Sequence, residues 1–223
     1  MPRQYHTRSS ARRSVSAALL IATAGIVAGC AAPRLQPLTG APAPKVLPQA
    51  ELAPGHRRIL FDWQLDDREL SGRGEGIARV ASPDSARLDL FLAGGFGSGA
   101  AVLIADSLQV TGGSLARRFV PPPALLWATL GRVAIPAVHD TVARVDGELL
   151  RVDIGMPASW RLTFRRDSLV RLERVRDGRV IEWVERSGAI VRYRSEEARR
   201  GLSLTVKSVQ EVPPFDASIW APF

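Results

Sequence analysis

From Ile59 onward, apolar and polar residues alternate with a period of two, and turn-forming residues interrupt the pattern about every eight to twelve positions. Alternation of this kind is typical of antiparallel strands with one buried face. Asp146-Gly147, Asp177-Gly178 and Ser187-Gly188 stand where two-residue hairpin turns need positive φ. The pattern predicts strands at 59–66, 71–81, 84–92, 100–106, 108–112, 141–146, 149–154, 159–166, 168–176, 179–187, 189–194 and 202–211.

Each of these strands has one apolar face. In 84–92, for example, Ala86, Leu88, Leu90 and Leu92 point to the same side. One apolar face per strand predicts one long curved sheet around a shared interior. The expected fold class is therefore mainly β, with a small helical part (α+β).

The alternation breaks at residues 121–136, where three prolines precede a run rich in leucine and tryptophan. Proline is tolerated in the first turn of a helix, and glycine followed by proline ends one, so 122–131 is predicted to be a short apolar helix. A helix this apolar must be covered, and the open side of the curved sheet would cover it. A second short helix is expected through 195–200.

The N-terminus has the composition of an export signal. Residues 1–13 contain four arginines and no acidic residue, and the apolar stretch 14–27 that follows is too short to span a bilayer as a helix. The stretch ends at Val27-Ala28-Gly29-Cys30, which resembles the lipobox of bacterial lipoproteins. This resemblance implies that residues 1–29 are removed and that Cys30 carries palmitate-like acyl chains. It also implies, from Ala31 in place of an aspartate, an outer-membrane lipoprotein facing the periplasm.

Six prolines within 31–54 interrupt any hydrophobic periodicity. The expected organisation is therefore a signal peptide at 1–29, a lipidated Cys30 with a proline-rich flexible linker at 30–56, and one β-rich domain at 57–223. Loss of the signal peptide lowers the formal net charge from +8 to +4. The remaining arginines alternate with acidic residues along the strands, which is typical of solvated strands and argues against a nucleic-acid partner.

Several features of 57–210 occur in a recognisable order. A strand ends near Trp63, the stretches 74–80 and 83–91 follow, and a glycine loop at 94–97 precedes a strand and the proline-bounded helix. This order resembles the LolA/LolB superfamily of lipoprotein carriers and receptors. The resemblance implies an incomplete antiparallel β-barrel of about 11 strands, lidded by one or two short helices, with an apolar cavity that binds acyl chains.

The sequence offers candidates for the lining of such a cavity. Large apolar residues on the predicted inward faces and on the helix form this set: Leu88, Leu90, Leu126, Trp127, Leu162, Phe164 and Trp183. The same residues would serve equally well as a solid core. Phe96, on the glycine loop, is a further candidate: by resemblance to LolB-like receptors, it is expected to contact membrane or cargo.

The sequence does not predict catalytic, cofactor or metal chemistry. A single cysteine cannot form a thiolate metal cluster, and His56 and His139 are too isolated to suggest a metal or relay site. The spacing of Gly95 and Gly97 matches a dinucleotide-binding fingerprint, but the sequence predicts a strand after them where such a site requires a helix. The expected function is a non-enzymatic carrier or receptor for lipid or lipoprotein acyl chains. The alternative is a structural or assembly lipoprotein that binds another envelope protein.

Overall fold

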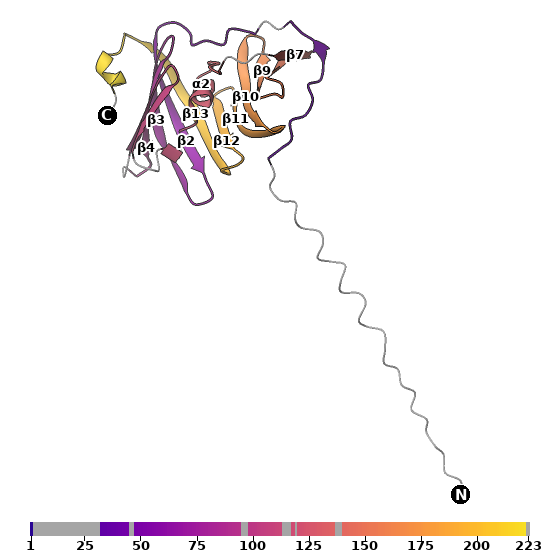
Figure 1. Cartoon of the computed structure of the whole chain (residues 1–223). Helices are drawn as coiled ribbons and strands as arrows, with labels where there is room; N and C mark the ends of the chain where they lie inside the picture. The colour runs from indigo at the N-terminus through magenta and orange to yellow at the C-terminus, as the bar shows by residue number, and fades with distance from the viewer. Residues whose placement is uncertain are drawn as a thin grey trace. The chain divides into compact units, whose positions relative to one another are not determined.

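The computed structural model describes residues 1, 32–44, 47–94, 98–112, 117–118, 120–136 and 140–221. The chain from Ala32 onward forms one compact unit, drawn in Figure 1. Cys30 and Phe96 lie outside the described residues, so their predicted roles stay predictions.

The described residues form one open antiparallel sheet of 13 strands. In space the strands follow the order β1-β7-β8-β9-β10-β11-β12-β13-β2-β3-β4-β5-β6, and the ends β1 and β6 are not paired with each other. The strands are β1 (Ala41–Pro42), β2 (His56–Asp66), β3 (Ser71–Ala81), β4 (Ser85–Leu92), β5 (Ser98–Ile104), β6 (Ser107–Thr111), β7 (Thr141–Asp146), β8 (Leu149–Ile154), β9 (Trp160–Arg165), β10 (Ser168–Arg176), β11 (Arg179–Ser187), β12 (Ile190–Ser195) and β13 (Arg200–Val212).

The predicted mainly β class and the incomplete barrel are confirmed. The β10–β11 hairpin turns through Asp177 and Gly178, which both have positive φ, as the predicted hairpin requires. The second predicted helix is wrong: 196–199 is a turn that joins β12 to β13, and Arg200 pairs directly with Ser195. Four residues between paired strands leave no room for a helix of useful length.

The sheet curves around helix α2 (Pro123–Thr129), which packs against β10, β11 and β12 (Figure 1). Prolines stand at its start, and all residues from Leu125 to Thr129 are buried. The Trp127 indole Nε1 donates a hydrogen bond to the Ala105 carbonyl oxygen at 2.7 Å, in the turn after β5. Trp127 therefore links strands β10–β12, against which α2 packs, to the turn after β5 on the other side of the interior.

Residues 32–44 and 47–54, which belong to the segment expected to form a flexible linker, make defined contacts. Residues 33–35 pair with the start of β11, Ala41 and Pro42 pair with β7, and the Ala43 amide donates to the Ala143 carbonyl. Ala50 and Leu52 are buried in the core. Proline does not prevent this arrangement, because an edge segment needs few backbone donors. We call residues 32–44 the strap.

Glycines on β3 let the aromatic rings of β2 lie against the sheet. A Cβ added at Gly74 would lie 1.8 Å from the Phe91 carbonyl oxygen and 2.8 Å from the Trp63 ring. The ring of Trp63 is thereby held over β3, and its Nε1 donates to the Glu75 carbonyl oxygen at 3.0 Å. Within the described residues, no helix has both the length and the apolar character required to cross a bilayer.

Candidate ligand-binding cleft

An apolar cleft of about 190 Å³ lies on the inner face of the sheet, beside the C-terminal end of α2. Strands β2, β3, β4, β11, β12 and β13, the end of α2 and the β11–β12 turn supply its walls. The lining residues are Ile59, Phe61, Ala78, Leu88, Thr129, Leu130, Arg186, Gly188, Ala189, Val191, Leu204, Val206 and Val209. Apolar side chains dominate this list, so the cleft suits an apolar group.

Arg186 is the one charged side chain among the described residues that line the cleft. Its guanidinium donates a hydrogen bond to the carbonyl oxygen of Thr129, the last residue of α2. A cation at a helix C-terminus is favourable because the carbonyl groups there carry partial negative charge. Burial lowers the pKa of Arg186 from its usual value. Arg186 thus connects β11 to the end of the helix that borders the cleft.

Next to the cleft, the interior is filled. Trp127 and Phe164 are fully buried, as are Leu125, Leu126 and Leu162. The Arg132 guanidinium carbon lies 4.6 Å from the centre of the Trp127 ring and covers it as a cation–π partner. This region is a packed core, and the cavity predicted around Trp127 is not open there.

The structure places the predicted lining residues in three environments. Leu88 lines the cleft, and Leu90 packs against the core nearby, partly buried. Leu126, Trp127, Leu162 and Phe164 belong to the packed core.

Trp183 lies on the outer face of the sheet. There its ring stacks under Arg171 at 4.4 Å, and its Nε1 donates to Glu196 Oε1 at 3.0 Å. It pairs across the sheet with Glu173, another outward residue.

Most of the cleft was not singled out by the sequence. Leu204 and Val206 follow the same alternation that identified the inward faces, so the pattern did indicate their direction. The side of the helix on which free space remains depends on how far the sheet curves, which a period-two pattern does not encode. Arg186 gave no signal because it is one of many arginines in the strands.

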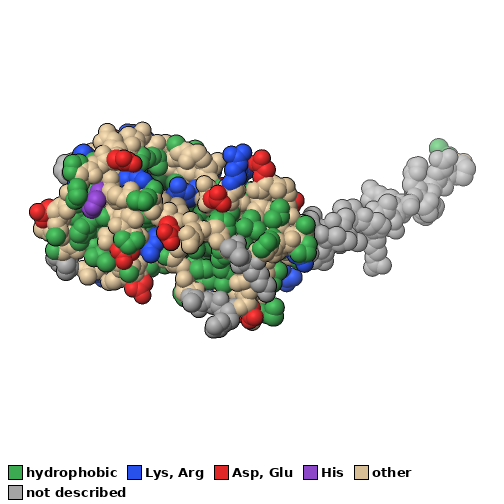
Figure 2. Space-filling view, turned by 90° about the horizontal axis from the view of Figure 1, so that it is seen from above, with side chains coloured by type: hydrophobic (Ala, Val, Ile, Leu, Met, Phe, Trp, Pro, Cys, Tyr) green, Lys and Arg blue, Asp and Glu red, His purple; other side chains and the backbone are tan. Residues whose placement is uncertain are grey.

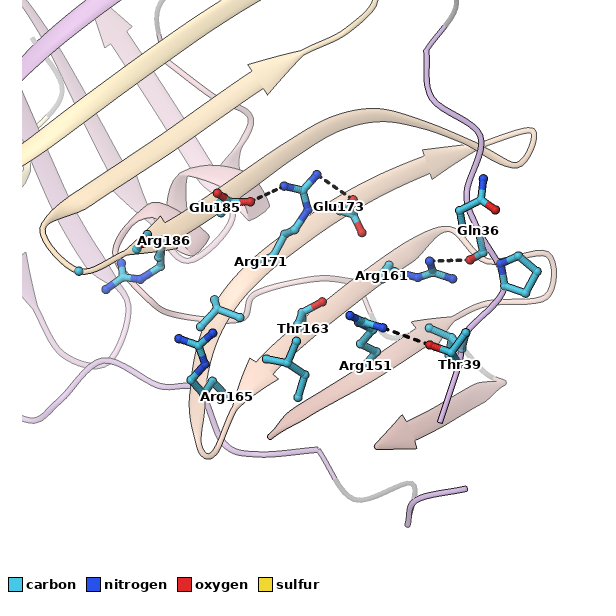
Figure 3. A pocket seen from close by; sticks show the side chains of 16 residues that line it. Gln36, Thr39, Arg151, Arg161, Thr163, Arg165, Arg171, Glu173, Glu185 and Arg186 are labelled. Atoms are coloured by element: carbon cyan, nitrogen blue, oxygen red, sulfur yellow. Dashed lines mark hydrogen bonds and ion pairs between the residues drawn. The ribbon is translucent and has the colours of Figure 1, made fainter. Parts of the chain in front are cut away.

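A second hollow, of about 640 Å³, lies on the outer face of β8–β11 (Figure 3). Arginines from neighbouring strands line it, and residues 36–39 of the strap form one wall. Arg161 bonds Asp153 at 2.6 and 2.8 Å and the Gln36 carbonyl oxygen at 2.7 Å, while Arg171 bonds Glu173 and Glu185. The bond from Arg161 to Gln36 holds the strap on the sheet. We call this hollow the outer groove.

Three buried or partly buried polar side chains on β10, β11 and β12 satisfy one another. The Tyr193 hydroxyl donates to Glu182 Oε1 at 2.8 Å, and Arg174 Nη1 lies 3.1 Å from Glu182 Oε2. Burial, followed by the nearby Glu182 charge, raises the pKa of Tyr193 above its usual value. A tyrosine held in its neutral form and a carboxylate with two donors are features of a structural network.

The described part of the chain contains no group of three or more His, Cys, Asp or Glu side chains arranged to hold a metal ion. On the face seen in Figure 2, acidic and basic side chains lie interspersed with apolar ones. The surface charges there are mixed in sign, which agrees with the modest net charge.

No family model and no curated protein matches this sequence. Solved structures with a similar fold outline include the following three. A domain described as an outer membrane lipoprotein-sorting protein from Vibrio parahaemolyticus has a TM-score of 0.48 and 5% identity, over 74% of this chain and 89% of that one. A LolA superfamily protein from Nitrosomonas europaea has a TM-score of 0.46 and 9% identity, over 78% of this chain and 93% of that one. A DUF1329 family protein from Desulfovibrio piger has a TM-score of 0.42 and 10% identity, over 75% of this chain and 90% of that one. Likenesses at this level do not establish a family for the chain.

Proposed function

We propose that this protein binds an acyl chain, or a similar flexible apolar group, non-covalently in the cleft beside α2. The observation that supports this proposal is the apolar cleft itself, with Arg186 as the one cation among its described lining residues. Non-covalent binding needs an apolar cavity and a way to open it, and it needs no catalytic residue. We propose further that acylated Cys30 anchors the protein to the outer membrane on the periplasmic side, and that Phe96 contacts membrane or cargo.

The size of the cleft limits what it can hold. At about 30 Å³ for each water-sized group, a volume of about 190 Å³ accommodates about six such groups. Burial of a methylene contributes about 0.8 kcal/mol, so six contribute about 5 kcal/mol before the costs of binding. The cleft therefore suits the end of one acyl chain. Deeper insertion would require Leu130, at the end of α2, to move away from the sheet.

Displacement of a fluorescent fatty-acid analogue by dodecanoate tests the proposal. The variant Val206→Trp adds a large ring to the cleft wall and should lower the affinity for the analogue at least tenfold. Val142→Trp is the matched control, because Val142 is 41% exposed and lies away from the cleft. Equal affinity in both variants, or no binding by the unmodified protein, would contradict acyl-chain binding in the cleft.

A second function is favoured by the packed core and the larger outer groove. If the interior stays closed, the protein would act as a structural or assembly lipoprotein whose outer face binds another envelope protein. Arg165, exposed at one end of the groove, and the strap residues that form its opposite wall would contact that partner. Site-specific crosslinking from position 165 in cells tests this function. A crosslinked envelope protein together with unchanged probe binding in Val206→Trp would favour the second function over the first.

A further inference from the structure

The strap fixes where the chain enters the folded unit. The Val180 amide donates to the Pro33 carbonyl oxygen at 2.9 Å, and the Leu35 amide donates to the Gly178 carbonyl oxygen at 2.8 Å. Between them, Arg34 forms a bridge with Arg179. The first described residues of the strap are therefore bonded to the β10–β11 turn.

This position limits the distance between the turn and the lipidation site. Two peptide units separate Cys30 from Ala32, so their Cα atoms are at most about 7 Å apart. The inference rests on the acylation of Cys30 proposed above. Acyl chains on Cys30 would then enter the bilayer within a short distance of the β10–β11 turn, although the 24 residues 31–54 would otherwise allow a long tether.

A bound anion would relieve the repulsion between two arginines at this turn, Arg34 and Arg179. Arg34 and Arg179 are opposite each other in an antiparallel bridge, so their side chains extend from the same face. Like charges in such a pair are destabilising. Among the described residues, neither guanidinium forms an ion pair with a carboxylate, and Arg179 contacts only the Ala32 carbonyl oxygen at 3.4 Å.

The acidic groups near this turn do not neutralise the positive charges of Arg34 and Arg179. Asp177 occupies the exposed tip of the turn, and Glu197 is paired with Arg176 at 3.0 Å. The neighbouring β8–β9 turn is adjacent, because the Val175 amide donates to the Ser159 carbonyl oxygen. It presents Met156, which is 76% exposed. A cationic pair beside an exposed apolar side chain is suited to a lipid head-group region.

We propose that the rim formed by the β8–β9 and β10–β11 turns is the surface that docks on the membrane, with Arg34 and Arg179 binding phosphates of anionic phospholipids. In this orientation, β11 extends away from the bilayer. Its other end is the β11–β12 turn, which borders the cleft. The eight steps along β11 place that turn about 25 Å farther from the membrane. The cleft would thus face the aqueous phase, where it could receive a ligand from another protein.

The acylated full-length protein, reconstituted in vesicles, tests this surface. Met156→Cys provides a labelling site for an environment-sensitive fluorophore, since acylation blocks the thiol of Cys30. We expect a blue shift in equimolar phosphatidylcholine and phosphatidylglycerol, and none in phosphatidylcholine alone. Arg34→Gln with Arg179→Gln should lower the docking equilibrium about 25-fold, because each basic residue near an anionic surface contributes about a fivefold gain. Salt should weaken the shift.

Two matched controls define the result. Arg165→Gln with Arg166→Gln removes the same charge from the β9–β10 turn, at the other end of the same strands, and should leave the shift unchanged. A fluorophore at Glu148→Cys, in the β7–β8 turn, should not shift.

A shift of equal size in both lipids, or equal loss in the two double variants, would overturn the proposal. So would an unmodified Cys30 in the mass spectrum of the N-terminal peptide. Loss of ligand binding in the cleft with docking intact would count against the proposed function alone.

Discussion

The inner face of the sheet has two regions that differ in how they are filled. Around Trp127, inward side chains of α2, β8 and β9, such as Leu126, Leu162 and Phe164, are fully buried. Beside it, β2–β4, β12 and β13 border an apolar cleft of about 190 Å³, although Phe61, Ala78 and Leu88 in its walls are themselves buried. Both regions follow the same alternation of apolar and polar residues. Helix α2 takes part in both regions: its Trp127 indole fills the interior as far as the turn after β5, and its C-terminal end borders the cleft. The connecting segment therefore influences where the interior is filled.

The largest effect is expected when the Trp127 ring is removed from the packed core. Trp127→Ala should lower the free energy of unfolding by about 3–5 kcal/mol, since it leaves a cavity and an unpaired Ala105 carbonyl group. Urea denaturation followed by circular dichroism measures the loss. Trp183→Ala is the control: this residue lies on the outer face, and the loss of its cation–π contact should cost about 1 kcal/mol. Equal losses would mean that the core around Trp127 is not specially packed.

Adding volume to each region compares them directly. Ala128→Val adds two methyl groups to the fully buried face of α2 and should destabilise the fold by about 1–3 kcal/mol. Ala78→Val adds the same groups to the cleft wall, where free volume accepts them, so stability should change little. The same denaturation measurement applies to both variants. A larger loss at position 78 than at position 128 would show that the cleft is closed in solution.

The sequence predicted the strands more closely than the site. Strands β10 and β11 begin and end where the alternation does, because turn residues with positive φ mark their limits. β1 was missed because Pro42 and its neighbours show no alternation, and its partner in β7 lies about 100 residues away.

The separation of core from cleft also could not be predicted. Leu162 and Leu204 both point inward, and the alternation assigns them the same face. Their different surroundings depend on the curvature of the sheet and on the rotamer of Trp127. Such information lies in tertiary packing, which has no local signature in the chain.

Arg186 lies at the border between the packed core and the cleft. Its replacement should therefore affect ligand binding more than the free energy of unfolding. Arg186→Met should cost about 1 kcal/mol, because the Thr129 carbonyl oxygen loses its donor. The same change should strengthen binding of the fluorescent fatty-acid analogue by several fold, since the cleft wall becomes more apolar. Arg192→Met, at an exposed position of β12, is the control and should change neither quantity. Weaker binding in Arg186→Met would indicate that the guanidinium contacts the ligand.

The smallest effect concerns Tyr193, and it depends on pH. Because the pKa of Tyr193 is raised in the folded state, this group contributes its full stability below the unfolded pKa of about 10 and loses it as pH rises above that value. At pH 10.5 the loss should be about 0.8 kcal/mol. Tyr193→Phe, which cannot ionise, should lack this part of the alkaline decline. The chain has two tyrosines in all, and Tyr5 lies in the predicted signal peptide, so the difference between the two pH profiles isolates one group. Parallel profiles would show that the Tyr193–Glu182 network opens to water before the fold is lost, and that the packed region is less closed than its burial indicates.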